Sequence, residues 1–124
     1  MAGSVPAKVT PDMPQFVKDY SNFYETKLGY HERSYGSTSG ASVTSVATFM
    51  NMQILSYADE IETPVLMIHG EKALSRYFSE DAFKKLKGDN KELYIVPNAV
   101  HTNLYYKMDV IPFDKIETFF EKNL

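Results

Sequence analysis

The chain has 124 residues, of which 44% are hydrophobic and 14% aromatic, and its formal net charge is -3. These proportions are typical of a globular domain with a buried core. The 13 basic residues are scattered, which argues against a nucleic-acid partner, and a sequence without cysteine and with three separated histidines predicts no disulfide, metal or other cofactor.

The sequence begins with small and polar residues, including Pro6 and Pro11, and residues 1–11 are therefore predicted to be a flexible arm. The remaining residues, 12–124, are predicted to form a single domain. We expect a cytoplasmic protein without a membrane partner, because the apolar runs are too short to cross a bilayer and no secretory leader is recognisable.

A first helix is predicted over residues 12–28. Asp12 is a good N-cap with Gln15 three residues later, and Gly29 would end the helix. Its apolar face is strongly aromatic, and such a face is typical of core packing rather than ligand binding. The aromatic positions on this face are Phe16, Tyr20, Phe23 and Tyr24.

Residues 30–42 are rich in Gly and Ser and are predicted to be a loop. The segment Gly36-Ser-Thr-Ser-Gly40 has the glycine spacing of a nucleophile elbow, but Thr38 occupies its centre and no apolar strand precedes it. We therefore do not assign a nucleophile to it. Residues 43–61 then predict one or two helices with a break near Asn51.

Two apolar runs predict buried parallel strands at about 63–69 and 91–97. Between them a helix is predicted at about 79–87, with Ser79 as N-cap and Gly88 at its end. A strand, helix, strand order makes the strands parallel, so the loops that carry Glu71 and His101 should open at the same edge. A last helix at about 112–123 should cover one side of this sheet.

With these elements in place, a family resemblance is visible. The second half of the chain is similar to the C-terminal part of α/β hydrolases of the dienelactone-hydrolase-like group, and it also resembles the X-Pro dipeptidyl peptidase family. The segments that carry the resemblance are Ile61-Glu-Thr-Pro-Val-Leu-Met-Ile-His-Gly-Glu-Lys-Ala73, Ser75-Arg-Tyr-Phe-Ser-Glu-Asp-Ala82 and Glu92-Leu-Tyr-Ile-Val-Pro-Asn-Ala-Val-His101.

The resemblance implies a truncated α/β-hydrolase-like core, with two parallel strands joined by a helix and with flanking helices. It places His101 at the position of the catalytic histidine and leaves Glu71 as the nearest candidate for the acid. This chain has Ala73 where relatives usually carry the acid and Leu74 where they often carry histidine. The strands that would bring the serine elbow and the oxyanion hole do not occur in the sequence.

Two classes of function follow. In the first, the chain is the C-terminal portion of a serine hydrolase acting on ester or amide bonds; it contributes His101 and Glu71 and is inactive without the missing N-terminal half. In the second, it is a non-catalytic α/β module that associates with itself, most simply as a dimer. The reason for self-association is that two strands leave open edges that something must cover. We assign structural roles to three other polar residues: His69 braces its turn, Ser75 is a loop residue and Ser79 is an N-cap.

Overall fold

The computed structural model describes residues 5–33 and 42–124. The chain forms two compact units, Met1–Gln53 and Ile54–Leu124. The segment from Gly36 to Gly40, with Thr38, lies outside the described residues. Within them, no helix combines the length and the apolar character that crossing a bilayer requires. The prediction of one domain over residues 12–124 stays a prediction.

The first unit contains helix α1 (Gln15–Tyr24), which is shorter at both ends than its pattern predicts. Its N-cap is Pro14 rather than Asp12, because the preceding residues form a turn in which the Met13 N–H donates to the Thr10 carbonyl at 3.2 Å. At the other end the Thr26 hydroxyl donates to the Asn22 carbonyl at 2.6 Å. A threonine that bonds locally to the backbone competes with helix continuation, which explains the early end.

Two further contacts tie the preceding segment to α1. The Ser21 hydroxyl donates to the Pro6 carbonyl at 2.7 Å, and the Lys18 amine donates to the Pro11 carbonyl at 2.8 Å. The aromatic rings of α1 stack edge to face along the helix, with Phe16 and Tyr20 centroids 6.1 Å apart. The unit also contains α2 (Ser45–Asn51), which ends at the predicted break.

The second unit is built on a parallel pair of strands, β1 (Val65–Gly70) and β2 (Lys91–Val96), as predicted. The register runs from Val65 opposite Lys91 to Gly70 opposite Val96. Among the described residues the sheet holds only these two strands, so each strand pairs along one edge and leaves the other open. The chain is therefore a small α/β structure with flanking helices.

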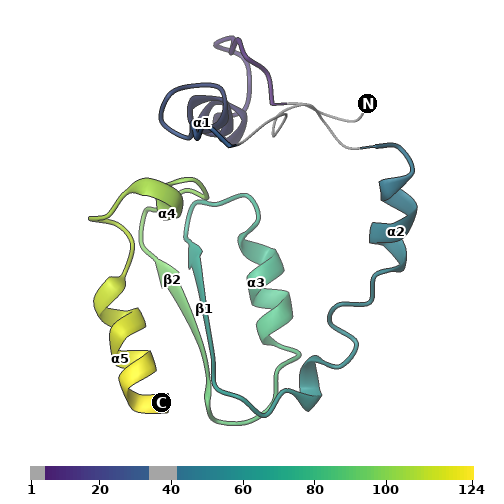
Figure 1. Ribbon diagram of the computed structural model, residues 1–124, viewed down its shortest axis with the longest axis vertical. Coiled ribbons are helices and arrows are strands. Elements are labelled where there is room, and N and C mark those ends of the chain that lie inside the picture. The colour runs from purple at the N-terminus through teal and green to yellow at the C-terminus, as the bar shows by residue number, and fades with distance from the viewer. Residues whose placement is uncertain (1–4, 34–41) are drawn as a thin grey trace. The chain divides into compact units, whose positions relative to one another are not determined.

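Four helices accompany the strands: a short 3-10 helix, η1 (Ala58–Glu60), then α3 (Arg76–Phe83), α4 (Asn103–Tyr106) and α5 (Phe113–Asn123). In Figure 1, α3 and α5 flank the strand pair from opposite sides. An ion pair between Lys115 and Glu92 ties α5 to β2. The N-cap of α3 is Ser75, four residues before the predicted N-cap Ser79, so Ser79 lies one turn inside the helix.

Apart from Ala58 on η1, which is 2% exposed, the most buried residues of this unit lie at the carboxyl edge of the strands rather than in the middle of the sheet. Val96 and the turn residues Ala73, Ala99 and Thr102 are all less than 9% exposed, and Ala99 is 1% exposed. The apolar side chains of β1, in contrast, are only half-buried. The best-buried part of the structure around the strands is therefore the place where the two strand-end loops meet.

Candidate functional site

The loops after β1 and β2 approach each other closely. The Glu71 N–H donates to the Val96 carbonyl at 3.0 Å, and the Lys72 N–H donates to the Ala99 carbonyl at 2.9 Å. A Cβ atom on Gly70 would lie 2.5 Å from the Ala99 carbonyl oxygen, which only glycine avoids. Because these backbones are joined, the histidines on either side of the contact, His69 and His101, are held near each other.

Five side chains at this edge form a continuous row of hydrogen bonds. The Ser75 hydroxyl lies 3.0 Å from His69 Nε2 and 3.0 Å from His101 Nδ1. Beyond them, Ser79 Oγ lies 2.8 Å from His69 Nδ1, and the Tyr105 hydroxyl bonds to His101 Nε2. Hydroxyls and imidazoles therefore alternate along the whole row, which we call the His69–His101 row: Ser79, His69, Ser75, His101 and Tyr105.

Three elements supply this row, and they meet at the same end of the strands (Figure 1). His69 is the penultimate residue of β1, Ser75 and Ser79 lie one helical turn apart on α3, and His101 precedes α4, which carries Tyr105. The two imidazole centroids are 5.9 Å apart. A spacing of four residues puts Ser75 and Ser79 on one face of α3, so both reach the same imidazole.

Ser75 is unusual among N-cap serines because its hydroxyl forms no cap hydrogen bond with the helix backbone. An N-cap serine that does so stabilises its helix by about 1 kcal/mol. The Ser75 hydroxyl bonds to two imidazoles instead. Its position in the sequence therefore suggests a cap, whereas its hydrogen bonds make it part of the histidine site.

The surroundings favour neutral imidazoles. Burial is the main cause that lowers the pKa of His69, with a smaller contribution from the nearby His101, while Glu80 acts in the opposite direction. Burial also lowers the pKa of His101. A neutral imidazole has one nitrogen lone pair that can accept a proton, so the row has the chemistry of a general base.

Glu71, the acid candidate from the sequence, lies on the turn after β1. Its carboxylate accepts a hydrogen bond from the Asn98 N–H at 2.8 Å. Asn98 has a φ of 59°, in the left-handed region, where a non-glycine residue is strained. The described contact of Glu71 therefore stabilises that turn, while both ring nitrogens of His101 bond to hydroxyls. The role of Glu71 as an orienting acid stays a prediction.

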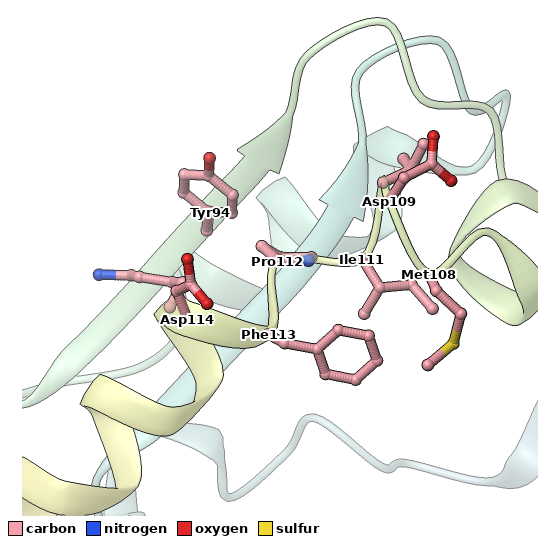
Figure 2. A pocket seen from close by; sticks show the side chains of 9 residues that line it. Tyr94, Met108, Asp109, Ile111, Pro112, Phe113 and Asp114 are labelled. Atoms are coloured by element: carbon pink, nitrogen blue, oxygen red, sulfur yellow. The ribbon is translucent and has the colours of Figure 1, made fainter.

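The described residues offer no group of three or more His, Asp or Glu side chains that could hold a metal ion. A cavity of about 450 Å³ lies elsewhere in the second unit, between β2 and the turn that leads into α5. Figure 2 shows Tyr94 on its β2 side and Met108 and Phe113 on the other. Neither histidine nor serine lines this cavity, so it is separate from the His69–His101 row.

Sequence reasoning found His101 and its place at the strand edge, but it gave His69, Ser75 and Ser79 roles in bracing and capping. The reason is the start of α3. With the N-cap at Ser79, that hydroxyl would face the helix backbone; with the N-cap at Ser75, both hydroxyls face the strand ends. The signal that could have found them is a pair of serines four residues apart, just after a strand whose penultimate residue is histidine.

No protein family model matches the chain. A relative from Pseudomonas aeruginosa, named uncharacterized protein PA2218, is 49% identical over 111 residues, which are 89% of this chain and 30% of that protein. The crystal structure of hypothetical protein PA2218 from Pseudomonas aeruginosa matches with a TM-score of 0.83 and 46% identity, covering 94% of this chain and 36% of that one. The chain thus spans about a third of the length of the relative it matches.

Proposed function

We propose that the chain is the C-terminal portion of an α/β-fold serine hydrolase that cleaves ester or amide bonds, and that His101 is the general base. The observation that carries this proposal is the position of a neutral, hydrogen-bonded imidazole at the carboxyl edge of two parallel strands. Ligands of open α/β sheets bind at that edge. The greater length of the relative agrees with a catalytic unit that needs further strands.

In this role His101 takes the proton of a serine hydroxyl through Nε2 and later returns it to the leaving group. In this proposal the nucleophile would replace the Tyr105 hydroxyl as the partner of Nε2. Acyl transfer also needs oxyanion donors, each of which contributes about 3 kcal/mol to transition-state stabilisation. Those donors and the serine would come from the missing half, so the chain by itself is inactive.

The first test is an esterase assay with the purified chain. We expect no turnover of small activated esters beyond the rate of free imidazole, because a base without a nucleophile and an oxyanion hole gives little acceleration. Turnover that is blocked by reagents specific for active-site serines would contradict inactivity of the isolated chain.

The second test uses the polypeptide encoded directly upstream in the genome. If that frame contains a Gly-x-Ser-x-Gly elbow, co-expression should produce esterase activity that His101→Gln abolishes. His31→Gln, in the first unit, is the matched control and should leave the activity unchanged. Equal activity of wild type and His101→Gln would overturn the assignment of the base.

A second function is favoured by a different observation. Large apolar side chains are exposed on the second unit; Phe78 is 61% and Met108 is 69% exposed, and both strands have an open edge. We therefore also propose a non-catalytic α/β module that associates with itself. An upstream region without any elbow-encoding frame would favour this module over the hydrolase.

A further inference from the structure

We infer that Ser75 is a proton-conducting bridge that joins His69 and His101 into a single two-imidazole base. The inference rests on the proposed function for the source of the proton, but the bridge itself can be measured without any hydrolase assay. Its structural basis is the position of one hydroxyl within hydrogen-bond distance of a nitrogen of each ring.

The proton positions along the row are restricted, because each neutral imidazole has one N–H and one lone pair and the Ser75 hydroxyl has one proton. If Ser75 donates to His69 Nε2, its oxygen accepts from His101 Nδ1–H, and His69 Nδ1–H donates to Ser79. If Ser75 donates to His101 Nδ1, every bond in the row reverses. In both patterns the two histidines carry their protons on the same type of nitrogen.

The first of these patterns is the one that suits a base. With the proton of His101 on Nδ1, its Nε2 lone pair can accept a proton from a hydroxyl at the position of the Tyr105 oxygen. As this N–H bond forms, the Nδ1 proton moves to Ser75 Oγ and the Ser75 proton moves to His69 Nε2. One proton enters the row, and the positive charge moves to His69.

Of the two imidazoles, His69 is the one whose charged form a nearby carboxylate favours, against the larger effects of burial and of His101, which lower its pKa. Glu80 on α3 favours the charged form of His69 and forms an ion pair with Arg76 at 2.7 Å. Glu80 thus favours a positive charge on the two-imidazole base through space, while its carboxylate bonds to Arg76. Glu71 is engaged with Asn98 on the neighbouring turn, and Tyr105 lies at the other end of the row.

The bridge also limits protonation of the pair. When both imidazoles are charged, all four ring nitrogens carry protons and can only donate hydrogen bonds. The Ser75 oxygen then lies between two N–H donors, and the Ser75 hydroxyl proton has no acceptor nitrogen left in the row. The pair should therefore take up two protons in separate steps, as interacting sites do.

The experiment is nitrogen-15 NMR of the histidine side chains in the full 124-residue chain, since nitrogen shifts report which ring nitrogen carries the proton. In the wild type at high pH we expect His69 and His101 to share one tautomer. Opposite tautomers would overturn the inference directly, and this measurement needs no variant.

Variants then test the bridge. His101→Gln should change the tautomer of His69 when Ser75 is present, and should not change it in a Ser75→Ala background. Ser75→Thr keeps the hydroxyl and should keep the coupling. An equal response of His69 with and without the Ser75 hydroxyl would show that the two rings interact only through space, which would overturn the bridge.

The role of Glu80 has its own variant pair. Glu80→Gln should lower the pKa of His69, because the carboxylate that favours its charged form is removed. Asp81→Asn on the same helix is the matched control; Asp81 pairs with Lys84 at 2.9 Å. A pKa of His69 that moves equally in both variants, or in neither, would contradict the role of Glu80.

Discussion

At the scale of single residues, the two histidines make the stability of the protein depend on pH. Their pKa values are lowered from 6.5 in the folded state, with burial as the largest cause for each. Between the lowered values and 6.5 the unfolded chain therefore binds more protons than the folded chain. The free energy of unfolding should rise with pH through this window and fall as acid is added, until both states are protonated.

Denaturant titrations between about pH 5 and pH 8 would measure this dependence. The double variant His69→Gln and His101→Gln should lose the histidine contribution to the slope, and the control His31→Gln should keep it. An unchanged slope in the double variant would mean that other groups cause the pH dependence.

At the scale of elements, the contact between the two strand-end loops depends on one glycine. A methyl group on Gly70 would meet the backbone of Ala99, which cannot rotate away as a side chain could. We expect Gly70→Ala to destabilise the protein by about 1–3 kcal/mol, the usual range for overpacking. The NMR signals of His69 and His101 should shift, because their loops must separate.

Gly88→Ala provides the control. Gly88 has a φ of 93°, so the substitution is strained, but it lies in the loop before β2, away from the histidines. Gly88→Ala should lower the free energy of unfolding by about 1–2 kcal/mol and leave the NMR signals of the two histidines unchanged. Unchanged histidine signals in Gly70→Ala would contradict the idea that this contact positions the site.

The elements also show what the sequence could predict. Both strands were predicted because a near-continuous apolar run is typical of parallel strands, and their pairing followed from the helix between them. The boundaries of α1 and α3 were less accurate. Residue preferences at helix N-caps favour Asp12 for α1 and Ser79 for α3. In the structure, a turn before Pro14 and the short loop after β1 determine where these two helices begin.

The site was predictable only in part, for a related reason. The position of His101 could be predicted because this residue lies in the loop after β2. The bridge through Ser75 depends on how α3 is rotated relative to the strand ends, and a shift of four residues in its N-cap changes which hydroxyls face them. No pattern in a single sequence specifies such a rotation.

At the scale of the whole molecule, the open edge of β1 predicts self-association. The N–H groups of Val65 and Glu71 point toward β2 and its flanking loops. Because N–H directions alternate along a strand, those of Leu66 and Ile68 point to the open edge. Pairing with the same edge of a second copy would give a continuous four-stranded sheet, joined by an antiparallel pair.

Light scattering on a sizing column, across a range of concentrations, should give a mass of about twice 14.1 kDa. Leu66→Pro removes an edge donor without removing a donor to β2 and should shift the mass to the monomer. Leu66→Ala, which keeps the N–H, should still self-associate. A wild-type chain that elutes as a monomer at every concentration would contradict this prediction.

The pairing of β1 with β2 also has a kinetic consequence. Val65 and Lys91 are partners in the register, and only one helix and two loops separate them in the chain. Loop-closure entropy rises with the length of the chain that is closed, so this pairing costs less entropy than contacts between more distant segments of the unit. The strand–helix–strand segment should therefore be the first part of the second unit to fold, with His69 and Ser75 already joined within it, and His101 arrives when the loop after β2 closes over Gly70.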